Sequence, residues 1–330
     1  MTPDEDTPAF DLFEYAIGEA CFAEDYDSFR LLLETRLRND AGGIGLVDST
    51  HPRDPRDEHD GTIAACLLSR AVWNVTPRPS NDFRPDPVTE PGRNDACRAS
   101  LACKVKQCCG SKPKPPTLDA EFVWSVLLDQ LSPDEIADAL ERKRVPARVA
   151  PLAASILVDE DPPLARGVLE ARYDGSLDRC DEHDAQILLL LCDAYDALKA
   201  PDDKAALLER MIQSRSLDAR TDALQRRATI FADRGDFAAA WVAFREAERT
   251  IPDDIFLAPL ELSLLVGEGR LDDAKRRADE LHKEFTEAGF DDDYPDLMAM
   301  FEQAKTDPVA AVAPPEPSEP TLQARPPNTR

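Results

Sequence analysis

The sequence has few of the residues on which most enzyme active sites depend. It has four histidines in 330 residues, and none is spaced as in the His-Glu-x-x-His zinc helix of metalloproteases. Its one glycine-rich stretch, Gly42–Gly45, lacks the flanking strand and the lysine of a phosphate-binding loop. A Gly-x-Ser-x-Gly nucleophile turn is also missing. We therefore expect no enzyme; the alternative is an unrecognised active site within residues 1–90.

Long apolar runs and a basic N-terminus are missing as well. Apolar runs such as Ile187–Cys192 are far shorter than the roughly 20 residues that a bilayer span requires. The first seven residues are acidic where a secretory leader would be basic. We therefore expect no contact with a membrane and a cytoplasmic location.

Basic residues are outnumbered, since 39 Lys and Arg stand against 65 Asp and Glu, for a net charge of −26. Such a charge keeps a protein soluble and disfavours binding of nucleic acid over the whole surface. It fits a solvated acidic surface or a basic partner.

The sequence does contain a helical repeat. Small and apolar residues recur at a spacing of 34 residues, which is the length of one helix–turn–helix unit. The first set is Leu224, Ala228, Phe231, Gly235, Phe237, Ala240, Phe244, Ala247 and Pro252, and the second is Ala258, Leu262, Leu265, Gly269, Leu271, Ala274, Ala278 and Leu281. Small residues let two helices approach closely, and a glycine takes a turn that needs a positive φ. The pattern predicts helical hairpins over residues 221–254 and 255–288.

These positions resemble the small and aromatic positions of tetratricopeptide repeats. The resemblance implies an all-α solenoid over residues 119–305, with a weaker unit at 187–220; there Pro201 replaces the turn glycine, while Ala194, Ala197 and Ala206 are kept. In that family the first helix of each hairpin lines a groove that binds a peptide or a partner helix. The corresponding groove residues are Asp222, Gln225, Thr229 and Phe256. The alternative is a generic antiparallel helical bundle.

Half of the eight cysteines lie within thirteen residues, at Cys97, Cys103, Cys108 and Cys109. In a reducing compartment, clustered thiols favour a metal over a disulfide, and four thiolates are a ligand set for tetrahedral zinc. Basic neighbours lower the pKa of thiols and help to form thiolates. The scattered Cys21, Cys66 and Cys192 lie on apolar helical faces and are interpreted as core residues.

The clustered stretch resembles the SEC-C motif, a zinc-binding cysteine motif of the bacterial preprotein-translocase ATPase and of many other bacterial proteins. The lead-in Gly92–Asp95, the first ligand Cys97 and the closing Cys108–Gly110 match at the spacing of the motif. The second cysteine of the motif falls at Ala99. The resemblance implies a bacterial protein with a zinc site in which Cys103 replaces that ligand; the alternative is a site that no longer binds metal.

The same segment is basic within an acidic chain, with six basic residues and only Asp95 as an acid over residues 91–114. Its candidate contact residues are Arg93, Arg98, Lys104 and Lys106. Such a patch fits RNA, the ribosome or an acidic protein surface, although no aromatic residue lies there to stack on bases. The alternative is that the patch docks on the acidic helices of the protein itself.

These features divide the chain into four parts: an N-terminal helical region (1–80), a proline-rich connector (81–118) with the cysteine motif at 91–110, the helical hairpins (119–305), and a tail with seven prolines (306–330) that is expected to be disordered. We expect an adapter that binds a protein or peptide in the solenoid groove, with the zinc motif as a second contact. The alternative is a ribosome- or RNA-associated factor. The sequence leaves the oligomeric state open.

Overall fold

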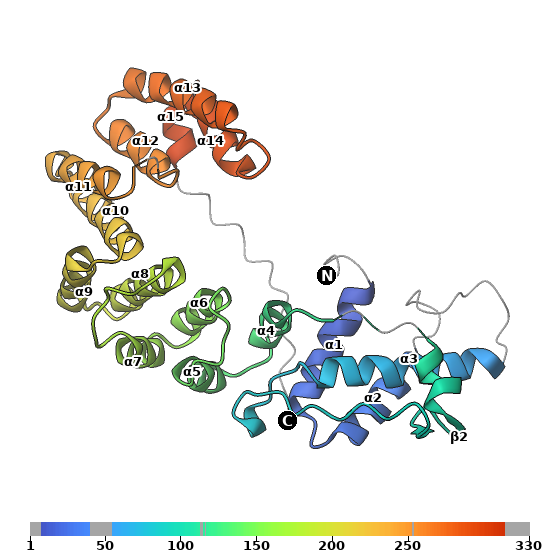
Figure 1. Ribbon diagram of the computed structural model, residues 1–330. Coiled ribbons are helices and arrows are strands. Elements are labelled where there is room, and N and C mark those ends of the chain that lie inside the picture. Colours follow the sequence, from blue (N-terminus) through green and yellow to red (C-terminus); the bar gives the residue numbers. More distant parts are fainter. Residues whose placement is uncertain (1–7, 40–54, 113–114, 116, 253, 314–330) are drawn as a thin grey trace. The chain divides into compact units, whose positions relative to one another are not determined.

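The computed structural model describes residues 8–39, 55–112, 115, 117–252 and 254–313. Within these residues the protein is all-α, as predicted, and its only sheet is one two-stranded hairpin (Figure 1). The chain forms two compact units, the first made of Met1–Gly175 and Gln186–Lys204, the second of Ser176–Ala185 and Ala205–Arg330. The first unit extends past residue 119, where the helical hairpins were expected to begin.

The first unit is a set of short helices, and the buried Trp73 lies in its N-terminal part. Its helices are α1 (Pro8–Phe22), α2 (Tyr26–Asn39), α3 (Pro55–Trp73), α4 (Ala120–Leu128), α5 (Pro133–Glu141), α6 (Ala150–Glu160), α7 (Pro162–Arg172) and most of α8 (Glu182–Ala197). Trp73 stacks on Phe29 of α2, and the Arg78 guanidinium lies 3.7 Å from the centre of its ring. Helix α1 contacts α2, α3 and α4, so the N-terminal region has a core of its own.

The proline-rich connector is irregular, as its composition predicts, and is tied to the end of α3. It contains one short turn, η1 (Pro79–Asn81). The Asn74 side chain accepts a hydrogen bond from the Val88 N–H at 2.8 Å and donates one to the Val88 carbonyl at 3.3 Å. The Trp73 indole N–H donates to the Asp86 carbonyl at 2.8 Å. The connector therefore lies along α3 and leads directly into the cysteine segment.

The cysteine segment is a small hairpin followed by two tight turns. Strands β1 (Ala96–Cys97) and β2 (Ser100–Lys104) are antiparallel, and η2 (Val105–Gln107) and η3 (Cys109–Ser111) follow. The turn η3 contacts α3, so the hairpin is held against the N-terminal helices.

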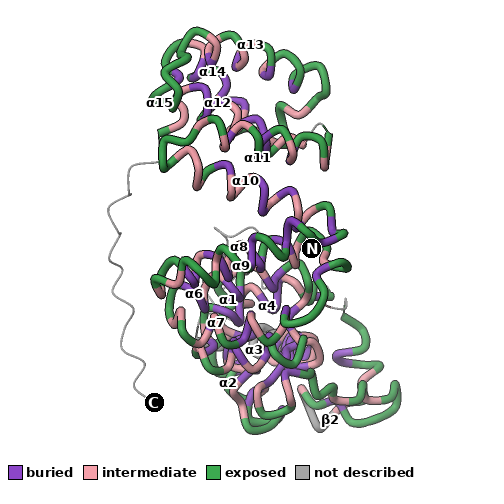
Figure 2. Tube along the Cα trace, turned by 90° about the vertical axis from the view of Figure 1, so that its left-hand side faces the viewer, coloured by how far each residue is buried: buried purple, intermediate pink, exposed green. Residues whose placement is uncertain are grey.

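The second unit is a succession of helices, each packed on the next. They are most of α9 (Pro201–Gln213), then α10 (Leu217–Asp233), α11 (Phe237–Thr250), α12 (Leu257–Gly267), α13 (Leu271–Ala288), α14 (Pro295–Ala304) and α15 (Pro308–Val312). From α10 to α15 each helix contacts its successor, and α10 also contacts α12. Buried residues recur along α10 and α11 between exposed ones (Figure 2). The predicted small positions Ala228, Ala240 and Ala247 are fully buried there.

The two predicted hairpins turn in the same way. Gly235 and Gly269, at equivalent positions of the repeat, both have a φ of +76°. The N–H of the residue after each glycine donates to the carbonyl five residues earlier: Asp236 donates to Phe231 and Arg270 donates to Leu265, both at 2.9 Å. This closure satisfies carbonyls at the end of the first helix, and it confirms the predicted turn at both glycines.

The weaker unit at 187–220 was aligned incorrectly. The turn after α8 is made by Lys199, whose φ is +54°, and the Ala200 N–H donates to the Tyr195 carbonyl at 2.8 Å. The prediction placed this turn at Pro201, which instead begins α9, and two of its alanines, Ala197 and Ala206, are exposed. The left-handed position of this turn therefore lies two residues before the predicted one, and Lys199 occupies it instead of a glycine.

The tail was predicted to be disordered from residue 306, but its first part is helical. Residues 308–312 form α15, in which Pro308 occupies the first turn and the Asp307 side chain accepts from the Ala310 N–H. Proline suits that position because it has no N–H to satisfy. Ala311 and Val312 pack on the cluster of buried residues between α12, α13 and α14. Residues 314–330 lie outside the described residues, as does the glycine-rich stretch at 42–45.

Candidate metal centre

Three of the four predicted cysteines form one compact group. The sulfur atoms of Cys97, Cys108 and Cys109 all lie within 4.8 Å of one another, and all three side chains are buried. The Cys97 and Cys109 sulfurs are 2.9 Å apart. Zinc–sulfur bonds of about 2.3 Å in a tetrahedron separate the sulfurs by about 3.8 Å. The group is therefore of the size that holds one metal ion.

The backbone brings these cysteines together by folding the segment back on its own lead-in. The Val105 N–H donates to the Asp95 carbonyl at 3.0 Å, and the Lys106 N–H donates to the Arg93 carbonyl at 3.1 Å. The Asp95 carboxylate accepts from the Gly92 N–H at 2.7 Å and closes the lead-in turn. The residues that carry the motif resemblance thus shape the hairpin.

The adjacent cysteines reach the same point because the chain turns sharply between them. Cys108 has a φ of −131° and a ψ of −110°, and the Ser111 N–H and hydroxyl both donate to its carbonyl. A side chain at Gly110 would place its Cβ 2.8 Å from the Val105 carbonyl oxygen, which is too close for any other residue. Glycine is therefore required where the motif has it.

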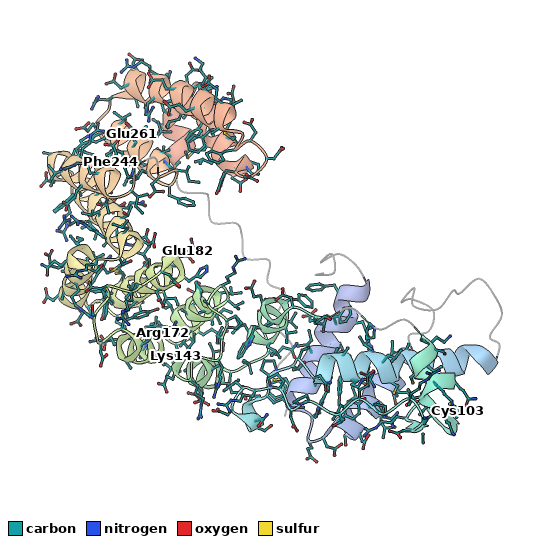
Figure 3. All side chains as sticks on the ribbon, in the orientation of Figure 1. Cys103, Lys143, Arg172, Glu182, Phe244 and Glu261 are labelled. Carbon is teal, nitrogen blue, oxygen red and sulfur yellow. The ribbon has the colours of Figure 1, made fainter. Side chains whose placement is uncertain are left out.

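Cys103, the predicted replacement ligand, lies outside the group of three. It is partly exposed on β2, at the position labelled on the hairpin in Figure 3. Its thiol is hydrogen-bonded to that of Cys108. Cys103 thus borders the group without belonging to it.

A fifth thiol, that of Cys66 on α3, was missed. It is 6% exposed, and with Ile63 and Leu67 it packs on the cysteine hairpin. Its thiol is hydrogen-bonded to that of Cys109. The interpretation as a core residue was sound for its apolar helical face. The spacing in the sequence gave no sign that this face meets the cysteine segment.

The hydrogen bonds between these thiols shift their pKa values. The hydrogen bond to Cys66, together with burial, raises the pKa of Cys109, which therefore stays protonated and donates. Accepting that hydrogen bond lowers the pKa of Cys66 to about 7, with help from the charges of Arg30, Arg70 and Arg98 and against the effect of burial. Burial raises the pKa of Cys108 to about 12, as do its hydrogen bonds to Cys97 and Cys103. A divalent cation binds such a group by displacing protons.

The predicted basic patch is divided by the structure. Arg98 pairs with Asp27 at 3.1 Å and lies over the ring of Tyr26, both at the start of α2, as the docking alternative expected. The other three members, Arg93, Lys104 and Lys106, are exposed, and none is ion-paired with another described residue. The exposed face of the hairpin is thus basic.

Two of the four predicted groove residues, Gln225 and Phe256, are hydrogen-bonded to a residue that was not predicted, Asp254. Asp222, Gln225 and Thr229 lie on α10, and Phe256 precedes α12. The Asp254 carboxylate accepts from the Gln225 side chain at 3.1 Å and from the Phe256 N–H at 3.0 Å. The Phe256 side chain is 63% exposed. Asp254 therefore joins the two helices on this face.

This face concentrates negative charge. Burial raises the pKa of Asp222 to about 6, and the nearby charges of Asp254 and Asp218 add to the effect. Burial likewise raises the pKa of Asp254. Carboxyl groups that resist ionisation in this way lack compensating positive charge.

A cleft of about 420 Å³ lies between α11, α12 and α13 and adjoins this face at Asp254. Its walls include apolar Phe244, Ile255 and Phe285, and acidic Asp254 and Glu261; Figure 3 labels Phe244 and Glu261. The cleft has the volume to admit side chains of a bound segment.

No protein-family model matches the chain, and neither a curated protein nor a solved structure matches it. Among the helices of the described residues, none is both long and apolar enough to cross a bilayer. The function therefore has to be argued from the two sites themselves.

Proposed function

We propose that this protein is a non-enzymatic, cytoplasmic adapter that binds a protein or peptide on its α10–α13 hairpins, in the manner of tetratricopeptide solenoids. The observation that carries the proposal is the face around Asp254, where α10 and α12 meet. It presents partly exposed polar side chains at Asp222, Gln225 and Thr229, and an exposed aromatic ring at Phe256. Exposed aromatic residues beside polar groups are enriched where proteins bind partners.

The charge of this face favours a basic partner. Burial and the nearby charges of Asp254 and Asp218 raise the pKa of Asp222. The walls of the adjoining cleft are apolar except for Asp254, three glutamates and Arg277, which pairs with Glu261 and Glu284. A segment with an apolar side chain flanked by Lys or Arg would lower the cost of keeping these carboxylates together. The net charge of −26 would speed its approach.

We further propose that the cysteine hairpin binds zinc as a structural ion. Cys97, Cys108 and Cys109 would hold it, since they form one compact group of buried thiols. Burial suits a structural zinc site, which keeps no position open for water or substrate. The ion would supply the cross-link that a hairpin of this size cannot obtain from a core of its own. In the adapter the hairpin would offer a second contact through its exposed basic side chains.

Site-specific photo-crosslinking in cells tests the adapter proposal. A photoreactive amino acid at Thr229 or Phe256 should yield discrete protein adducts, and adding Asp254→Asn should reduce their yield. The matched control is Val242, which is 65% exposed on α11 and should yield none. Equal adducts from Val242, or none from Thr229 and Phe256, would count against a binding face around Asp254.

A second candidate is association with RNA or the ribosome, which the exposed Arg93, Lys104 and Lys106 favour. Binding through these residues should weaken steeply with salt, by a slope set by the few phosphates contacted. The triple variant with Glu at these positions should lose it, whereas Asp222→Asn should not. Salt-independent binding that survives the triple variant would rule this candidate out.

A further inference from the structure

The junction between α3 and the cysteine hairpin contains more thiol chemistry than the motif accounts for. Cys66 is buried there, and its thiol is hydrogen-bonded to that of Cys109, a member of the group of three. The thiols form a connected series in which Cys66 contacts Cys109 at one end and Cys103 contacts Cys108 at the other. A structural zinc site takes four ligands, and so either end of this series is placed to supply the fourth.

The geometry points to Cys66 as the fourth ligand, so that the metal is shared between helix α3 and the cysteine hairpin. This inference rests on the proposed binding of zinc by Cys97, Cys108 and Cys109. Cys66 lies outside that group of three, and ligation therefore requires its thiol to move toward Cys97 and Cys108.

A small cavity supports this choice. It measures about 10 Å³, and its walls include Cys66, Cys97 and Cys109. This is about the space that one water-sized probe occupies, and a zinc ion is smaller than a water molecule. Cys103 and Cys108 do not line this cavity; it therefore marks space beside Cys66, Cys97 and Cys109 toward which the Cys66 thiol can move.

The charges around Cys66 support it as well. Four thiolates around a divalent cation carry two excess negative charges, which are costly to bury without compensation. Three arginines act electrostatically on Cys66: Arg30 from α2, Arg70 from α3 and Arg98 beside Cys97. Arg70 also lines the cavity, as does Arg98. Positive charge is thus supplied from three separate elements around this end of the series.

Cobalt titration of the untagged, reduced full-length chain tests the inference. Thiolate-to-cobalt charge-transfer absorption reports the number of sulfur ligands, and competition with a chelator reports zinc affinity. Replacement of partners outside the ligand shell already costs about 10–100-fold in affinity. Cys66→Ala should therefore weaken zinc binding by at least about 100-fold and remove about a quarter of the charge-transfer intensity. Cys103→Ala, which removes a hydrogen bond to Cys108 from outside the ligand shell, should leave the charge-transfer intensity unchanged and weaken zinc binding by no more than about 10–100-fold.

Matched variants separate ligation from folding. Cys21→Ala removes another buried helical thiol of the first unit and should not affect metal binding, whereas Cys97→Ser should abolish it. Cys66→Ser keeps the polarity and nearly the volume of Cys66 and should fail like Cys66→Ala. A loss with Cys103→Ala and none with either Cys66 variant would overturn the inference and leave the zinc proposal standing. A wild-type chain that binds neither metal would overturn both, and the crosslinking result would be unaffected.

Discussion

In the α10–α13 hairpins, each helix packs on its neighbour in the sequence, whereas the cysteine hairpin also packs on a helix distant in the sequence, α3. The helical hairpins derive their stability from buried residues such as Ala228 and Phe244, and from a glycine turn repeated at the same interval. The cysteine hairpin buries little besides its thiols and packs against α3 at Cys66. The helical hairpins can be changed by local substitutions, whereas the cysteine hairpin depends on a distant helix and, in our proposal, on a metal ion.

Metal removal should produce the largest difference in stability between the two regions. Structural zinc contributes on the order of 10 kcal/mol to the folding of small zinc peptides, so chelation should abolish amide protection throughout residues 91–111. Protection in α10–α13 should stay the same. Hydrogen exchange with and without chelator measures this, and loss of protection in both regions at once would contradict the comparison.

Truncation of Phe244 should have the converse effect. The ring is 2% exposed, and loss of a buried phenyl group costs about 3–5 kcal/mol. Phe244→Ala should therefore shift the unfolding of the second unit to much lower urea, as followed by circular dichroism, without changing the cobalt spectrum of the cysteine site. Val242→Ala, on the exposed side of the same helix, should change stability by less than about 0.5 kcal/mol.

The pH dependence of the second unit should follow Asp222. Its pKa is raised from 3.8 to about 6 by burial, so the folded state holds the proton more tightly than the unfolded state. The resulting stabilisation is complete below about pH 4 and is lost as the pH rises through 6, at a cost of about 3 kcal/mol at neutral pH.

Asp222→Asn tests this sign. The variant should be more stable than the wild type at pH 7 by that amount, and the difference should vanish near pH 4. Asp233→Asn, at an exposed site on the same helix, serves as the control in urea titrations at both pH values. A wild-type chain that gains stability from pH 4 to pH 7 relative to the variant would show the opposite linkage.

The smallest expected effects are at the turns. Gly235→Ala should destabilise the second unit by about 1 kcal/mol, because a Cβ disfavours its positive φ. Lys199→Gly should stabilise the end of α8 by a similar amount, since a lysine now occupies the left-handed position there. Thermal unfolding of the two variants should shift in opposite directions. A shift in the same direction would mean that the two turns are not equivalent.

The sequence predicted the α10–α13 hairpins well because their contacts are local and periodic. The glycine turns and the buried alanines followed from spacing alone. The same rule failed at Lys199, where the backbone adopts the left-handed turn without a glycine to mark it. The helix at 308–312 was missed because two of its residues contribute only a little apolar area, and the surfaces that receive them on α12 and α13 cannot be inferred from the tail.

The candidate site was predicted only where its ligands share one segment. Cys97, Cys108 and Cys109 were found through their spacing, whereas Cys66 and Asp254 come from elements whose packing the spacing does not encode. Cys66 resembled any other apolar helical cysteine. Asp254 followed a helix-ending proline and resembled a loop residue. In both cases the missing information was which helix face meets which segment.

The two hydrogen bonds between Asn74 and Val88 fix the position of Val88 relative to the end of α3. They separate the first part of the proline-rich stretch from a short strap that runs from Val88 to Cys97, whose length is fixed by its two ends. The part before Val88 is fixed by other contacts, since Phe83 stacks on Trp124 and Asp82 pairs with Arg144. One extra residue in the strap would displace the first cysteine from its partners, although no cysteine had changed.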